Sequence, residues 1–340
     1  DWPRFLERGM TFGVKAQVWD SEVTSSLLVQ KRARDAVCDC LRDASGWRPE
    51  DPRGAPPSLP LNVAIFRDYA QVYLDTSGLS LHKRGYRRGA VHKAALNEAA
   101  AAGLLQLAGL DERAGRAEPL VLADPMCGSA TLLIEAGLLL TRTAPGLLRD
   151  DWPFEAWTDF DAESWSAAVE QAEGERVALP ADVVLTGNDV HEGALALAEE
   201  DAHAAGLGDA IAFECGECRD FAPPMRPSMV VTNPPWGLRL LGPGERDRRP
   251  GRGGSRSAEE GDTEEEAVRA PWTQLGGFLR RECPGADAFV LSGSKAATKF
   301  LRLSAAQKHV VSLGGVDARL LHYAIRDRAD IECFACGGTG

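Results

Sequence analysis

Short apolar runs alternate with longer segments of helical spacing through the middle of the chain. Four runs have the length and β-branched content of buried strands: 120–123, 183–189, 210–215 and 230–232. The first two are each followed by an Ala- and Leu-rich run long enough for a helix, at 131–140 and 192–206. This order predicts an α/β fold in which helices connect the strands of a mostly parallel sheet.

A smaller strand–helix–strand pattern precedes this region. Residues 11–19 and 62–74 are predicted strands, and 25–45 places apolar and charged residues at helical spacing between them. The intervening 46–59 is Pro-rich and polar, which is typical of a loop. We therefore expect a small α/β domain over 1–75, a linker over 76–92 and a larger domain over 93–330.

The larger domain contains a segment of a different character. Residues 242–267 are rich in Gly, Arg, Pro and Ser and then in Glu. They cannot bury enough apolar area to offset the entropy of ordering, so we expect a disordered insertion. Beyond it the pattern predicts a helix, a strand, a short helix and a terminal hairpin, at 272–281, 288–292, 294–301, 309–313 and 318–325. The tail 331–340 has no predicted element.

The strand at 230–232 stops at the sequence Asn233-Pro234-Pro235-Trp236. Proline supplies no donor to the strand ladder and fixes its own φ, so a rigid loop follows the strand. The loop offers acceptors, the Asn233 side-chain oxygen and a backbone carbonyl, beside the flat indole of Trp236. These features fit a planar ring with an exocyclic amino group, because the amine can donate while the ring stacks. Taken alone, the motif is more typical of a surface Pro-Pro turn.

A second loop joins the strand at 120–123 to the helix that follows it. Asp124 closes the strand, and the small residues 127–130 form a tight turn before Thr131. A strand, a small-residue loop and a helix expose backbone N–H groups at a helix N-terminus. The loop lacks the G-x-G-x-x-G fingerprint and the lysine of a phosphate loop, which favours a ligand with a carboxylate over a nucleotide phosphate.

Acidic residues follow two other predicted strands. Asp189 closes the strand at 183–189 and can accept hydrogen bonds from both hydroxyls of a ribose. Glu217 and Asp220 both follow the strand at 210–215, where an acid can meet an adenine amino group. Ligands of open α/β sheets gather at the carboxyl ends of the strands, so the order of these motifs predicts a single site.

Charge and composition narrow the class of protein. The 340 residues carry a formal net charge of −12, which excludes a surface that is basic overall. The charge is uneven, since residues 1–100 hold 15 Lys and Arg against 12 Asp and Glu. The sharpest basic cluster comprises His82, Lys83, Arg84, Arg87 and Arg88 around Tyr86. Such a cluster suits an RNA backbone, and a solvated loop is the alternative.

Other sequence features argue against metal and membrane functions. Cys215-x-x-Cys218 and Cys333-x-x-Cys336 have the spacing of zinc ligands, but packed reduced thiols are favoured and no metal is expected. No apolar run reaches membrane-spanning length. We expect a soluble protein of the cytoplasm or of an organelle, chloroplast or mitochondrion. The chain lacks an initiator Met, and part of its N-terminal region is expected to be missing.

Several separated segments together resemble the THUMP-domain guanine-N2 RNA methyltransferases, and the bacterial-type 23S rRNA enzymes most closely. These segments are Asp75–Arg87, Asp124–Ser129, Leu132–Ala136 and Ala144–Leu147, with the aromatic residues Trp152, Phe154 and Trp157. The resemblance spans about 11–325. It implies a Rossmann-like, S-adenosylmethionine-dependent methyltransferase sheet, mostly parallel with an antiparallel C-terminal hairpin. It also implies a partial THUMP-type α/β domain before the sheet, and methyl transfer to guanine N2 in large-subunit rRNA.

The resemblance assigns roles to individual residues. It implies that Asn233, Pro234, Pro235 and Trp236 hold the target base and are catalytic. The implied cofactor-binding residues are Asp124, Pro125, Cys127, Gly128, Ser129, Thr131, Asp189, Glu217, Asp220 and Asn233. RNA is expected on the side of the basic cluster at 82–88, and no obligate protein partner is inferred.

Two positions depart from the family pattern. Ala130 stands where the family usually has Gly, which narrows the loop, and Trp236 replaces the commoner Tyr.

The alternatives that remain open are a tRNA guanine-N2 methyltransferase, an adenine-N6 or glutamine methyltransferase with the same loop, and an inactive RNA-binding or assembly protein.

Overall fold

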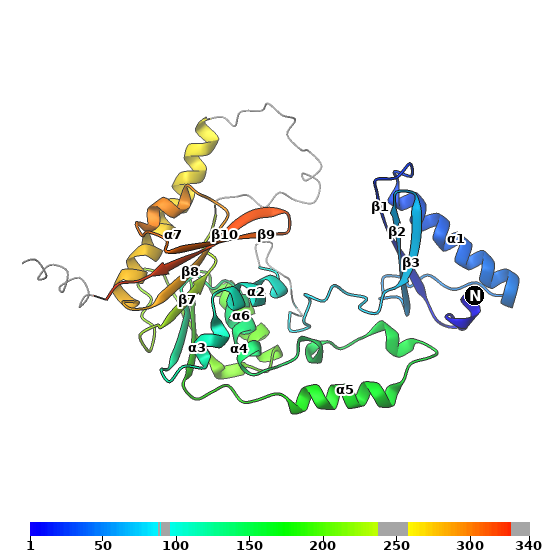
Figure 1. The fold of residues 1–340 in the computed structure, drawn as a ribbon, viewed down its shortest axis with the longest axis horizontal. Coiled ribbons are helices and arrows are strands. Elements are labelled where there is room, and N and C mark those ends of the chain that lie inside the picture. The colour runs from blue at the N-terminus through cyan, green and yellow to red at the C-terminus, as the bar shows by residue number, and fades with distance from the viewer. Residues whose placement is uncertain (88, 90–95, 237–257, 328–340) are drawn as a thin grey trace, which may run out of the picture. The chain divides into compact units, whose positions relative to one another are not determined.

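The structure is a computed structural model that describes residues 1–87, 89, 96–236 and 258–327, apart from the side chains of 258–267. The chain divides into two compact units, Asp1–Lys83 with Arg149–Gly174, and Arg84–Leu148 with Glu175–Gly340 (Figure 1). The sequence places 149–174 in the larger domain, but this segment packs with the first unit. Trp157 Nε1 donates to the Ser58 carbonyl at 3.2 Å, and Arg149 Nη2 donates to the Ser77 carbonyl at 2.6 Å.

The first unit contains a three-stranded sheet and a long helix. Its elements are η1 (Trp2–Arg4), β1 (Phe12–Trp19), α1 (Ser26–Ser45), β2 (Leu59–Phe66), β3 (Tyr69–Leu74), η3 (Pro153–Ala156) and α5 (Ala162–Gly174). β1 pairs with β2 in parallel and β2 pairs with β3 antiparallel. The single strand predicted at 62–74 is wrong, because Arg67 and Asp68 turn the chain with φ of 48° and 62°.

The second unit is built on a seven-stranded sheet of order β6-β5-β4-β7-β8-β10-β9. The strands are β4 (Leu120–Asp124), β5 (Val183–Asp189), β6 (Ile211–Cys215), β7 (Met229–Thr232), β8 (Asp287–Ser292), β9 (Gln307–Leu313) and β10 (Val316–Ala324). The first five run parallel, whereas β10 is antiparallel to both β8 and β9. The predicted mostly parallel sheet with an antiparallel C-terminal hairpin is therefore confirmed.

Helices cover both faces of this sheet (Figure 1). They are α2 (Glu98–Leu107), α3 (Leu110–Ala114), α4 (Thr131–Leu140), η2 (Pro145–Leu148), α6 (Glu192–Ala204), η4 (Gly208–Ala210), α7 (Ala258–Glu282) and η5 (Ala297–Leu301). One apolar cluster joins α2, α4 and α6 to the strands, and a second joins α7 and η5 to them. In the part of the chain that the structure describes, no helix is long and apolar enough to cross a bilayer.

The long helix α7 corrects the predicted disorder at 242–267. It begins at Ala258, so the last ten residues of that segment are helical. Their Ala- and Glu-rich sequence has high helix propensity, and the run continues into the buried positions Val268, Trp272 and Leu275. The remainder of the predicted insertion, 242–257, lies outside the described residues.

Candidate active site

Four predicted site residues stand at the carboxyl ends of adjacent strands. Asp124 ends β4, Asp189 ends β5, Glu217 follows β6, and Asn233 follows β7. β4 lies between β5 and β7, with Asp124 opposite Gly187 and Ala123 opposite Val230. Parallel strands end at the same edge of the sheet, so the fold brings these side chains to one edge, as the sequence predicts.

The small-residue loop after β4 is tied to the end of β5. The backbone N–H of Gly128 donates to Asp189 Oδ2 at 2.8 Å, and the His191 N–H donates to Asp189 Oδ1 at 3.0 Å. Gly128 has a φ of 56°, with no neighbouring atom within 4 Å of the place where a Cβ would stand. The loop thus needs glycine for its backbone conformation and leaves open space above it.

Asn188 is a site residue that the sequence analysis missed. Its side chain is fully buried, and its Nδ2 donates to the carbonyls of Pro125 at 3.2 Å and Gly216 at 3.0 Å. The main-chain carbonyl of Asn188 accepts from the Cys127 N–H at 2.9 Å. One amide therefore fixes the loops that follow β4 and β6. The available signal was a polar residue within an otherwise buried strand.

Burial sets the protonation of the groups in the first loop. Asp124 is 1% exposed, and burial raises the pKa of its carboxyl to about 7, although the Met126 N–H donates to it at 3.2 Å. Burial also raises the pKa of the Cys127 thiol well above its usual value. Cys127 is therefore a packed neutral thiol, which excludes a thiolate nucleophile here.

The loop after β7 is held at two points. The Pro235 carbonyl accepts from Trp272 Nε1 of α7 at 2.8 Å, and Trp236 Nε1 donates to the Leu291 carbonyl of β8 at 3.2 Å. Just before these anchors, Asn233 Oδ1 is buried and receives no hydrogen bond from any described residue. A buried acceptor without a donor is costly, so this atom fits a ligand that brings its own N–H or O–H group.

The two candidate acids after β6 differ in their surroundings. Glu217 is half-buried, and its Oε2 accepts from Gln274 Nε2 of α7 at 2.8 Å. Asp220 is exposed and paired with its neighbour Arg219 at 3.4 Å. Glu217 is therefore the better-held carboxylate for a ligand at this edge.

Two arginines of the predicted RNA-binding cluster are interior residues. Arg84 pairs with Glu135 at 3.5 Å, and Arg87 pairs with Glu98 at 3.4 Å and Asp201 at 3.7 Å. The side chains of Arg84 and Arg87 are only 12% and 9% exposed. Their guanidinium groups neutralise buried carboxylates, so the expected contact of these two residues with RNA phosphates is corrected.

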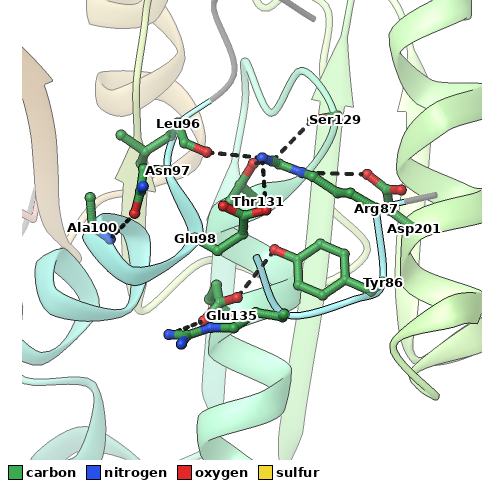
Figure 2. A network of polar contacts seen from close by, with 11 residues as sticks. Tyr86, Arg87, Leu96, Asn97, Glu98, Ala100, Ser129, Thr131, Glu135 and Asp201 are labelled. Carbon is green, nitrogen blue, oxygen red and sulfur yellow. Dashed lines mark hydrogen bonds and ion pairs between the residues drawn. The ribbon is translucent and has the colours of Figure 1, made fainter. Parts of the chain in front are cut away.

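Arg87 also reaches the predicted cofactor loop (Figure 2). Its Nη2 donates to Thr131 Oγ1 and, at 3.5 Å, to Ser129 Oγ. The Tyr86 hydroxyl donates to Glu135 Oε1 at 3.1 Å in the same network. The Ser129 and Thr131 side chains thus face Arg87. This arginine therefore holds the start of α4 in place.

The remaining residues of the basic cluster and the cysteines of the two Cys-x-x-Cys motifs differ in exposure. Lys83 is exposed, His82 is half-buried and Arg88 lies outside the described residues. Cys218 is buried and Cys215 is exposed, while Cys333 and Cys336 are not among the described residues. Over the described ranges, no group of three or more His, Cys, Asp or Glu side chains has the arrangement of a metal site.

Comparisons with known proteins agree with this architecture. A family model described as "RMKL-like, methyltransferase domain" matches residues 84–247. "Putative RNA methyltransferase slr0064" of Synechocystis sp. is 30% identical over 96% of this chain and 77% of its own length. The chain therefore belongs to the RMKL-like methyltransferase family.

One further relative and one solved structure show how much of each protein the chain matches. A "Ribosomal RNA large subunit methyltransferase K/L" of Syntrophotalea carbinolica is 34% identical over 96% of this chain but 43% of its own length. The chain thus spans less than half of that enzyme. The structure of SMU.472, "a putative methyltransferase complexed with SAH", matches with a TM-score of 0.71 and 24% identity, covering 96% of this chain and 78% of that one. The fold is that of the class I S-adenosylmethionine-dependent methyltransferases.

Proposed function

We propose that this chain transfers a methyl group from S-adenosylmethionine to the exocyclic N2 of a guanine in RNA, with large-subunit rRNA as its substrate. The observation that carries the proposal is Asn233 Oδ1, which is buried directly after β7 and receives no hydrogen bond from any described residue. The "Ribosomal RNA large subunit methyltransferase K/L" relatives support the choice of rRNA. Such a substrate implies a compartment that holds ribosomes, the cytoplasm or an organelle.

The residues at the strand ends suit the three parts of this cofactor, whose sulfonium supplies an electrophilic methyl group. Asp124 and the loop 125–131 bind the methionine end, where the open space over Gly128 leaves room for it. Asp189 accepts the ribose hydroxyls, and Glu217 accepts the adenine amine, with Asp220 as the alternative. Each assignment uses an acceptor already held in place by a backbone N–H or by Gln274.

The loop after β7 holds the target amine. Asn233 Oδ1 and the Pro234 carbonyl accept the two N–H bonds of the amine, which favours a pyramidal nitrogen with an available lone pair. The Trp236 indole, fixed by its hydrogen bond to Leu291, stacks on the base and sets its angle of approach. Catalysis then depends on positioning and on hydrogen bonds that strengthen as charge develops. No strong base is needed, because the nitrogen loses its proton after it has become positively charged.

The first unit contributes RNA binding in this proposal. Its β1–α1–β2 module with β3 serves as a THUMP-type domain over about 1–75. Residues 76–92 connect it to the methyltransferase domain over 93–330, from which 149–174 is excepted because it packs with the first unit.

Incubation with labelled S-adenosylmethionine and unmodified transcripts tests the proposal. Large-subunit rRNA and a tRNA pool are offered separately, and the labelled RNA is digested and analysed by mass. N2-methylguanosine from the rRNA is the expected product. N6-methyladenosine, or label only in tRNA, would replace the proposed substrate with one of the alternatives. No label in either RNA would contradict the activity.

A further inference from the structure

A basic pocket opens in the second unit at the carboxyl end of β8. Its volume is ≈ 610 Å³. Its polar lining includes Lys295, Thr298, Lys299, Ser304, Lys308 and Arg319. None of the residues that line it is acidic. The pocket therefore joins four cationic side chains and several hydroxyl groups, which together are the donors that phosphate groups require.

The charge of this pocket contrasts with the rest of the domain. Residues 101–340 carry 23 Lys and Arg against 38 Asp and Glu, whereas 292–323 contains five basic residues and one acid. No ion pair links Lys295, Lys299, Lys308 or Arg319 to an acid within the described ranges. Uncompensated positive charge that is concentrated in a concave surface attracts a polyanion, because the low-dielectric walls focus the field.

The pocket lies next to the loop after β7, which is proposed to hold the target amine. Ser292 and Ser294 line it, and Gly293 between them lies against the Trp236 ring. A Cβ at position 293 would stand 2.6 Å from Trp236 Cε3, so only glycine permits this contact. Thr232 of β7 pairs with Val290 of β8, which places both strand ends at the same edge. The strand pairing and the Gly293–Trp236 contact thus place the pocket beside the loop after β7.

The wall that bears Lys295 and Lys299 is anchored to α7. A Cβ at Gly276 of α7 would lie 2.4 Å from the Leu301 carbonyl oxygen, so α7 and η5 are in direct backbone contact. Arg280 Nη1 donates to the same carbonyl at 3.0 Å. Thr298 Oγ1 also donates to the Lys295 carbonyl at 2.9 Å. This anchoring keeps the lysine-bearing segment in place before any ligand binds, which reduces the ordering cost of binding.

We propose that this pocket binds the phosphate backbone of the RNA next to the target guanine. The inference rests on the proposed function and deepens it by naming where the substrate backbone binds. The contacts are electrostatic and made to phosphates, so they set affinity and register on the strand without selecting its sequence. In this proposal the cationic residues within 295–319 bind the RNA backbone, and the buried arginines Arg84 and Arg87 do not.

The test compares two variants with the same change in charge. The Lys295→Gln/Lys299→Gln double variant removes two positive charges from the pocket. Arg116→Glu also lowers the charge by two, but Arg116 is an exposed residue before the amino end of β4, at the opposite edge of the sheet. Filter binding of the full 340-residue chain to an unmodified large-subunit rRNA transcript, over a series of salt concentrations, gives the affinity and its salt dependence. Methyl transfer to the same transcript is measured separately.

We expect the double variant to bind the transcript about tenfold more weakly and its log–log salt slope to fall by roughly one per lost phosphate contact. Arg116→Glu should match the wild type, and S-adenosylmethionine affinity should stay within twofold in both variants. Equal behaviour of the two variants, or a wild-type chain that does not bind RNA, overturns the pocket assignment. A wild-type chain that binds RNA through the pocket without methylating it would instead contradict the proposed function alone.

Discussion

The backbone N–H of Gly128 donates to the carboxylate of Asp189 across 2.8 Å, which joins the loop after β4 to the end of β5. Two loops that are 61 residues apart in the sequence thereby share one hydrogen bond at the predicted cofactor site. The same carboxylate also accepts from the His191 N–H. Asp189 therefore holds both the loop after β4 and the start of the loop after β5.

We expect Asp189→Ala to weaken S-adenosylmethionine binding by about 10- to 100-fold, because hydrogen bonds to a charged group contribute about 1.5–3 kcal/mol. Calorimetric titration measures this affinity. Asp182→Ala is the matched control, since Asp182 is an exposed acid that precedes the amino end of β5. Equal affinity of the two variants would mean that Asp189 does not hold the ribose.

The raised pKa of Asp124 has a defined effect on stability. The folded protein retains a proton on Asp124 up to a pKa of about 7, while the unfolded chain releases it near its ordinary value of 3.8. The native state thus binds more protons between these values, so its unfolding free energy falls as the pH rises through this window. Asp124→Asn should lose this contribution. Urea unfolding at pH 5 and pH 8 measures it, and an unchanged pH dependence in the variant would contradict the assignment.

Ala130 occupies a backbone conformation that favours glycine. It is fully buried at the start of α4 with a φ of 54°. An L-residue in this region costs about 1–2 kcal/mol, so Ala130→Gly should raise the unfolding free energy by about 1 kcal/mol after the entropy of the unfolded chain is included. Ala99→Gly, at an exposed position in α2, should lower it by about 0.5–1 kcal/mol. Thermal and urea unfolding would contradict this account if both changes had the same sign.

The positive charge of Arg87 stabilises the ionised form of two buried carboxyl groups. Burial raises the pKa of Asp201 to about 6, and Arg87 pairs with both Asp201 and Glu98. Arg87→Ala should destabilise the protein by about 3–5 kcal/mol at pH 8. The loss should be smaller at pH 5, because the unpaired carboxyls then take up protons. Lys83→Ala, at an exposed position, should change little at either pH.

The positions of the strands along the chain and the acids at their ends are predictable from the sequence, because both depend on local pattern. Apolar runs of strand length mark β4, β5, β6 and β7, and the residue that ends each run stands at the carboxyl edge of a parallel sheet. The hairpin of β9 and β10 is predictable for the same reason. Local spacing thus carries most of the fold of the second unit and the composition of its site.

Long-range pairing is the part that local pattern cannot give. Arg84 and Arg87 were predicted to be exposed in a run of basic residues, yet they pair with acids of other helices. These acids are Glu135, Asp201 and, closer in the sequence, Glu98. Asn188 was missed because its hydrogen bonds go to backbone groups of two other loops. The turn between β2 and β3 was missed because its two residues with positive φ are not glycine, so no composition signal marks them.

The most direct test compares cofactor binding with methyl transfer in Asn233→Ala. Calorimetry measures S-adenosylmethionine affinity, and single-turnover labelling of the unmodified rRNA transcript measures transfer by the same preparation. Removal of an acceptor that acts on the amine should reduce transfer at least about 100-fold while cofactor affinity stays within twofold of the wild type. Parallel loss of both, or transfer at the wild-type rate, would contradict the role of Asn233 at the target amine.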